Sequence, residues 1–220
     1  MDLQALWLTL KLASVTTLLL LCASIPLSYW LVFGKTRWKS IVEAVATLPL
    51  LLPPTVLGFY LLVLLGPRTL PGRFLIHLIG HPIAFSFSGL VIGSMIYSLP
   101  FAVQPITSGF STIATEILDA AILLGANRLT ILTSLVLPLA QRSIFTAAVL
   151  CFTHTIGEFG VVLMIGGDIP GATRTLSIAM YDQVQDFRYS QANHTALLLL
   201  AISLGALILV YGWRKQLRRV

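Results

Sequence analysis

Long apolar stretches recur along the chain and alternate with short polar segments. Five of them are long enough to cross a bilayer, which takes about 20 residues at 1.5 Å per residue. They lie near residues 6–33, 41–65, 85–109, 143–165 and 193–213. The pattern therefore predicts an all-α integral membrane protein with about five transmembrane helices in one transmembrane domain, residues 1–220.

Composition supports a membrane protein and excludes most soluble classes. Hydrophobic residues make up 57% of the chain and charged residues 10%, and the mean hydropathy is +0.92. A soluble globular domain carries about 25% charged residues. The net charge of +6 lies at the ends of the apolar stretches and forms no basic stripe, so no nucleic-acid partner is expected. Cys22 and Cys151 lie inside apolar runs, which argues against a disulfide or a metal site.

The positions of lysine and arginine predict the orientation. Cytoplasmic loops of membrane proteins are enriched in these residues. Basic clusters at 35–39 and 214–219 follow the first and last stretches. With five spans, both are cytoplasmic only if the N-terminus is outside and the C-terminus inside. The outer loops still contain Arg68, Arg73, Arg174 and Arg188, so the bias is incomplete.

The segment at 111–140 falls on the cytoplasmic side in this topology. Asp119-Ala120-Ala121 is strongly helical, Gly125 can end or bend a helix, and a second short helix would run to Pro138. A helix, a bend and a helix would then project from the membrane and offer small residues to a partner. The alternative is a plain amphipathic connector.

This segment resembles the cytoplasmic motif of ABC importer permease subunits. That motif reads Glu-Ala-Ala, three residues, Gly, nine residues, Ile-x-Leu-Pro; here Asp119 replaces Glu and Leu135 replaces Ile. In that family the short helix docks in a cleft of the ATPase subunit. The resemblance implies a type I importer permease fold and a coupling helix at residues 119–127. The implied coupling residues are Asp119, Ala120, Ala121, Gly125, Ala126, Asn127, Arg128, Leu137 and Pro138.

Three further segments, at 48–62, 156–176 and 181–184, resemble bacterial molybdate permeases. The resemblance implies a subunit of the inner membrane that moves molybdate, and tungstate as a second cargo, by ATP-driven alternating access. It also implies two copies of an ATPase subunit, a periplasmic molybdate-binding protein and a second copy of this chain as partners. The nearest alternative cargo is sulfate or thiosulfate. His154 and Ile122 depart from the family, which usually has Arg and a basic residue there.

Prolines and hydroxyl groups inside the spans are candidates for the translocation pathway. Pro49, Pro53 and Pro54 remove backbone donors in the second stretch, and a broken helix at membrane depth must face protein or water. A half-helix starting near Pro54 and Thr55 would point its positive end at an oxyanion. Neutral side chains add to these candidates in the third stretch, namely Ser98 and Gln104. Packed kinks without a pathway role are the alternative.

Glu158 is the one acidic residue deep in the fourth stretch, and intramembrane carboxylates are functional candidates. A negative charge would repel an anion, so we expect a structural or gating role rather than substrate contact. His154 lies one turn earlier, but a two-residue pair is too small for a zinc site. No metal, cofactor or catalytic residue is therefore expected.

Residues 174–187 predict an amphipathic helix at the outer surface. Its charged residues Asp182 and Asp186, with Arg188, would contact a binding protein or form a solvated face.

Two other classes of protein compete with an importer subunit. The chain has no GxxxxGK[ST] phosphate loop, so a partner must hydrolyse ATP. A membrane-embedded enzyme would need convergent reactive side chains, which only His154 and Glu158 approach. A passive anion channel would not need a docking helix, and ATP dependence of the flux would separate it from a pump.

Overall fold

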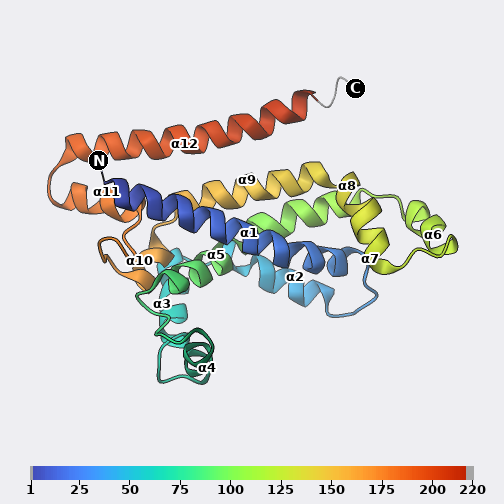
Figure 1. Ribbon diagram of the computed structural model, residues 1–220, viewed down its shortest axis with the longest axis horizontal. Helices are drawn as coiled ribbons and strands as arrows, with labels where there is room; N and C mark the ends of the chain where they lie inside the picture. The colour runs from blue at the N-terminus through green and yellow to red at the C-terminus, as the bar shows by residue number, and fades with distance from the viewer. Residues whose placement is uncertain (1, 217–220) are drawn as a thin grey trace.

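The computed structural model describes residues 2–216, and within this range all regular structure is helical. The longest helices run alongside one another, with short helices at both ends of the bundle (Figure 1). The helices are α1 (Leu3–Phe33), α2 (Lys39–Thr47), η1 (Leu48–Leu50), α3 (Pro54–Leu64), α4 (Leu70–Ile79), α5 (Phe87–Ser111), α6 (Thr115–Leu123), α7 (Arg128–Ile131), the π-turn η2 (Leu132–Val136), α8 (Leu137–Leu139), α9 (Gln141–Gly157), α10 (Gly160–Gly166), α11 (Leu176–Gln185) and α12 (Tyr189–Gln216).

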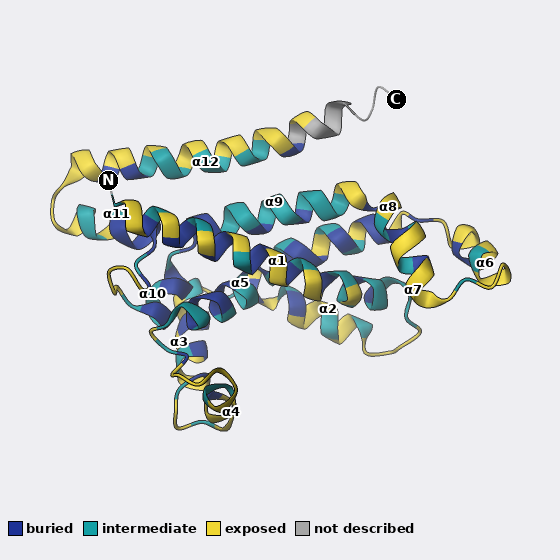
Figure 2. Ribbon diagram, viewed as in Figure 1, coloured by how far each residue is buried: buried dark blue, intermediate teal, exposed yellow. Residues whose placement is uncertain are grey.

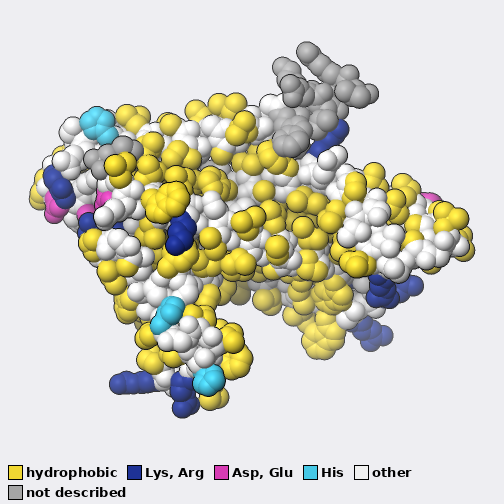
Figure 3. Space-filling model, viewed as in Figure 1, with side chains coloured by type: hydrophobic (Ala, Val, Ile, Leu, Met, Phe, Trp, Pro, Cys, Tyr) yellow, Lys and Arg dark blue, Asp and Glu magenta, His cyan; other side chains and the backbone are white. Residues whose placement is uncertain are grey.

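Three of these helices are long and apolar enough to cross a membrane: α1, α5 and the Tyr189–Val210 part of α12. Two further pairs qualify only when taken together, because each is bent. The pair Lys39–Leu50 and Pro54–Leu64 bends by 112°, and the pair Arg128–Leu139 and Gln141–Gly157 bends by 75°. Hydrophobic side chains cover most of the visible face, while charged side chains gather mainly towards the two ends of the long axis and on α4 (Figure 3). This gives up to five spans in a helical membrane protein, in agreement with the predicted fold class.

The core of the bundle is α5, which packs against both α1 and α9. Where these helices meet, Leu20, Ala102 and Cys151 are almost fully buried. A second apolar cluster, which includes Ile106 and Phe110, joins the end of α5 to the short helices after it. Figure 2 shows buried residues along α1 and α5 and on α10, whereas α9 is mostly half-buried. The core therefore links the membrane-spanning part to the α6–α8 segment.

Helix α12 lies at the edge of the bundle (Figure 1). Only 11% of its apolar window is buried inside the protein. Large apolar side chains such as Leu200 and Leu204 are exposed along it. We assign this face to lipid. Arg218 and Arg219 of the basic tail lie outside the described residues.

The second and fourth predicted spans are interrupted. Pro53 and Pro54 separate η1 from α3, as the prolines predict. The fourth span stops at Gly157, and α10 begins only at Gly160, because the backbone at Glu158 is extended (φ −66°, ψ 131°). By contrast, α5 continues as one helix through Pro100 and Pro105. The continuous fourth helix that the sequence predicts is therefore wrong.

Candidate functional site

The segment after α5 forms a helix, a bend and a second helix. Helix α6 ends in a Schellman motif, in which the Ala126 amide donates to the Ala121 carbonyl at 3.0 Å. Gly125 carries the positive φ of +84° that this motif requires. The Asn127 side chain then caps α7 by accepting from the Thr130 amide at 2.8 Å. Gly125 thus ends one helix and Asn127 starts the next.

The register of this helix differs from the prediction. The sequence predicts a helix at residues 119–127, whereas α6 spans Thr115–Leu123 and the bend occupies the following four residues. The reason is local: the left-handed backbone conformation of Gly125 ends the α-helix, so the helix cannot extend to residue 127. Asp119, Ala120 and Ala121 lie in the second half of α6, while Ala126 and Asn127 lie in the bend.

The bend exposes large apolar side chains at the far end of the molecule. The α6 segment projects beyond the long helices (Figure 1). Leu123 and Leu124 are each 88% exposed, and Ile122 is 58% exposed. Arg128 beside them is also exposed. Apolar side chains presented in this way, outside the membrane-spanning part, are candidates for contact with a protein partner.

The other half of the segment is anchored to the bundle. Ile131, Val136 and Ala140 are buried in the apolar cluster at the end of α5, and Leu137 packs against it. Pro138 is exposed at the second position of α8, just before the turn into α9. The exposed bend is therefore connected to a packed base, the apolar cluster of residues 131–140 with the last turns of α5 and the first turns of α9.

The two interrupted spans meet at their breaks. A Cβ added to Gly160 would lie 2.7 Å from the Pro54 Cβ, and one added to Gly58 would lie 2.7 Å from the Met164 Cβ. These distances are too short for any larger residue without movement. Helices α3 and α10 therefore approach as closely as glycine permits, and the break after Pro53 lies next to the break at Glu158.

The predicted pathway residues divide into exposed and buried groups. Pro53, Thr55 and Gln104 are exposed on the single chain, and Pro54 packs against Gly160. Ser98 is fully buried.

The buried Ser98 holds His154. The Ser98 hydroxyl lies 2.8 Å from His154 Nδ1 and 3.2 Å from the Thr155 hydroxyl. The imidazole stacks on Phe101 at 4.1 Å between ring centroids and lies 4.8 Å from the Tyr97 ring. Sequence reasoning missed this aromatic enclosure, although Tyr97 and Phe101 are one helical turn apart on α5. Ser98 therefore positions the His154 imidazole.

Glu158 lies at the break itself and is 4% exposed. Its main-chain carbonyl accepts a hydrogen bond from the Ser177 hydroxyl at 2.6 Å, which ties the break to α11. Neither carboxyl oxygen makes a hydrogen bond of good geometry. His154 donates or accepts at Ser98 instead, and among the described residues no three metal-ligating side chains form a group. The arrangement fits a structural role for Glu158 better than direct contact with an anion.

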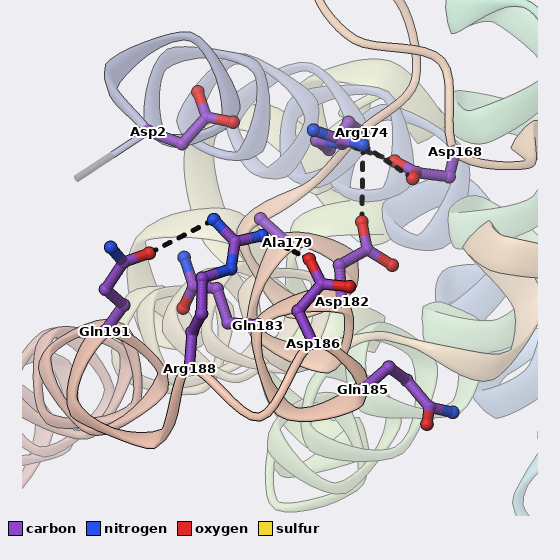
Figure 4. Close-up of a pocket in the computed structure, with 10 residues that line it drawn as sticks. All are labelled: Asp2, Asp168, Arg174, Ala179, Asp182, Gln183, Gln185, Asp186, Arg188 and Gln191. Carbon is purple, nitrogen blue, oxygen red and sulfur yellow. Dashed lines mark hydrogen bonds and ion pairs between the residues drawn. The ribbon is translucent and has the colours of Figure 1, made fainter.

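The opposite end of the bundle contains a charged cluster around a cavity of about 490 Å³ (Figure 4). Two nitrogens of Arg174 donate to the two carboxyl oxygens of Asp168, and Arg174 Nη2 lies 3.3 Å from Asp182 Oδ2. Hydrogen bonding by Arg174 lowers the pKa of Asp168, while burial beside Asp168 raises the pKa of Asp182. Arg188 pairs with Asp186. The contact between Arg174 and Asp182 links the loop before α11 to α11 itself.

The predicted outer helix is shorter than expected. It covers Leu176–Gln185 rather than residues 174–187. Phe187 lies beyond its end with a positive φ of 58°, so the last two residues of the predicted helix are not helical. Asp182 faces the charged cluster rather than standing free in solvent (Figure 4).

A bundle of long apolar helices with two interrupted spans and a protruding, exposed apolar bend fits a multi-pass membrane transport subunit. The comparison with known families agrees. Residues 20–219 match the model of the binding-protein-dependent transport system inner membrane component. The chain belongs to this family and is a multi-pass protein of the inner membrane.

Several relatives match over nearly the whole chain. The molybdenum transport system permease protein ModB of Azotobacter vinelandii is 45% identical over 97% of this chain and 95% of its own length. ModB of Escherichia coli K12 is 33% identical over 98% of this chain and 94% of its own. ModB of Mycobacterium tuberculosis is 32% identical over 94% and 77%.

Solved structures of ABC importers share the fold. A chain of the methionine transporter MetNI, in inward-facing conformations, matches with a TM-score of 0.74 at 16% identity, covering 98% of this chain and 95% of that one. A bacterial ABC transporter involved in alginate import matches with a TM-score of 0.73 at 17% identity, covering 99% and 79%. The predicted type I importer permease fold is therefore confirmed.

Proposed function

We propose that this chain is the membrane-spanning permease subunit of an importer that carries molybdate, and tungstate, into the cytoplasm. The observation that carries this proposal is the 45% identity to a molybdenum permease along almost the entire chain. The three relatives reported above are named molybdenum permeases, which favours molybdate over the sulfate alternative.

The exposed bend after α6 is the proposed contact with a separate ATPase subunit. Leu123 and Leu124 would fill an apolar cleft on the ATPase, while the base of the segment passes its movement to α5 and α9. Two copies of the ATPase would serve two copies of the permease. Closure of the ATPase dimer on ATP would pull the two bends together and switch the cavity from inward-open to outward-open.

A second copy of this chain is the proposed other wall of the pathway. The break between η1 and α3 leaves Leu51 82% exposed, and free carbonyls at membrane depth are stable only against protein or water. The exposed Thr55 and Gln104 would then face a shared path whose neutral polar groups let a dianion pass without tight binding. Glu158 would stabilise the break, and a periplasmic binding protein would deliver molybdate at the α11 end.

Uptake of labelled molybdate tests the cargo. A strain that lacks this chain, complemented with the wild-type chain, should recover ATP-dependent uptake at submicromolar molybdate that excess sulfate barely inhibits. Unchanged uptake after deletion, or competition by sulfate at equal concentration, would show that molybdate is the wrong cargo. Flux that persists after ATP depletion would exclude an importer.

Crosslinking tests the ATPase contact. In a chain without Cys22 and Cys151, a Leu124→Cys variant should crosslink to the ATPase subunit. A matched Leu204→Cys variant, exposed on α12, should not. Equal crosslinking of both would contradict the docking surface.

A further inference from the structure

Helix α4 is the one element of the outer connection between α3 and α5 that stands away from the bundle (Figure 1). It is a well-defined helix: Thr69 caps its start by accepting from the Gly72 amide, and Gly80 ends it with a φ of +83°. One face, with Leu75 and Ile76, packs against the apolar cluster that includes Leu57 and Leu61 of α3. The remaining two faces are exposed.

The first exposed face is apolar. Leu70, Phe74 and Leu78 follow one another at intervals of four residues, so they form a single stripe along the helix. They are 76%, 69% and 71% exposed. A stripe of this size on a short helix requires an apolar environment.

The second exposed face is basic. Arg73 and His77 each lie one position before a member of the apolar stripe, so they form a parallel stripe beside it. Arg68 precedes the helix and His81 follows it, and residues 66–86 contain no acidic residue. The other outer arginines, Arg174 and Arg188, pair with aspartates, whereas no ion pair within 4 Å involves Arg68 or Arg73 among the described residues.

We propose that α4 is an interfacial helix that binds the membrane surface and recognises the phosphate groups of anionic lipids. The elements on both sides of α4 belong to membrane-spanning segments, so the connection lies at the bilayer surface. Its apolar stripe enters the acyl-chain boundary while the neighbouring basic stripe lies at the level of the phosphates. Arg68 and Arg73 supply the charge that complements phosphatidylglycerol. This surface is independent of the cargo and of the ATPase.

Tryptophan quenching in lipid vesicles tests the proposal on the full chain. The four native tryptophans are replaced by phenylalanine, and Phe74→Trp becomes the sole reporter. Vesicles contain phosphatidylcholine and phosphatidylglycerol, one of which carries brominated acyl chains. Leu204→Trp on α12 is the matched control for lipid contact without neighbouring basic residues.

The Phe74→Trp signal should be quenched by brominated lipid and little by aqueous acrylamide. Each arginine near an anionic surface contributes roughly fivefold to binding, so brominated phosphatidylglycerol should be preferred by up to about 30-fold. Replacing Arg68 and Arg73 with glutamine should remove this preference and leave quenching by brominated phosphatidylcholine. Leu204→Trp should show no preference.

Three outcomes would overturn the proposal. Efficient acrylamide quenching would place α4 in water. Protection from both quenchers would place it under protein, either a second copy or a binding protein. Lipid quenching without a preference for phosphatidylglycerol would refute phosphate recognition. A preference that remains after both arginines are replaced would refute it as well.

Discussion

Replacing Gly125 by alanine tests the coupling bend through backbone conformation alone. A Cβ at this position meets no atom within 4 Å, so the substitution causes no clash. The φ of +84° is unfavourable for any residue with a Cβ, and the left-handed conformation costs about 1–2 kcal/mol. The native bend should therefore lose population by a factor of about 5–30 relative to alternatives.

Gly80 provides a matched control at the opposite end of the protein. It has a φ of +83°, ends helix α4 and also has open space where a Cβ would lie, so alanine there carries the same backbone penalty. Both variants should lower the thermal stability of the purified protein similarly. Only Gly125→Ala should uncouple ATP hydrolysis from molybdate uptake, and Gly125→Asn should restore part of the uptake because asparagine tolerates this conformation.

The assay is ATP hydrolysis and molybdate uptake by the same reconstituted importer, with protein levels matched. Equal loss of uptake in Gly125→Ala and Gly80→Ala would mean that general destabilisation explains the effect. Full coupling in Gly125→Ala would mean that the shape of the bend does not matter to the ATPase. Either result would refute the reasoning.

Four other substitutions test the packing and the polar contacts. Gly58→Ala should destabilise the protein by about 1–3 kcal/mol through overpacking between α3 and α10, whereas Gly205→Ala, with open space around it, should stabilise α12 by up to about 1 kcal/mol, as thermal unfolding would show. Arg174→Gln should cost up to about 1 kcal/mol. The pKa of Asp168 lies below its ordinary 3.8, so the stability that Arg174 contributes should be present above pH 3.8 and be lost as the pH falls through the lowered pKa. Unfolding of both proteins as a function of pH would test this. Ser98→Ala should lower the stability by about 1 kcal/mol, because it removes the hydrogen-bond partner of the His154 imidazole and the Thr155 hydroxyl, as thermal unfolding would show.

The number of spans and the bend were predictable because both depend on local properties. Apolar length alone identifies the membrane-spanning segments. Gly125 and the Asp119-Ala120-Ala121 run indicate a helix that ends at a glycine, whatever the rest of the fold does. The start of α6 was not predictable, because Ala114 provides no side-chain cap and the helix simply begins where α5 turns away.

The break in the fourth span and the charged cluster could not be predicted from the sequence. The segment around Glu158 contains glycines but no proline or polar turn, so its apolar pattern indicates one helix. The break becomes visible only with α3 and α11 in place, since Pro54 packs on Gly160 and Ser177 binds the Glu158 carbonyl. The ion pair between Asp168 and Arg174 depends on the conformation of the loop between them. The spacing of the two residues in the sequence does not determine that conformation.

Helix α9 physically joins the two regions that sequence and structure single out. Its first residues rise from the packed base of the α6–α8 segment, where Ala140 and Ala147 belong to one apolar cluster. Its last residue, Gly157, leads into the extended Glu158 and the close contact of α3 with α10. An α-helix of this length is about 25 Å long and stiff, so a displacement at one end reaches the other. If the bend moves with the ATPase, as proposed, the break at Glu158 is the first point along α9 where the backbone can absorb the rotation. Pro54 and the exposed Thr55 lie against Gly160, at the end of this break.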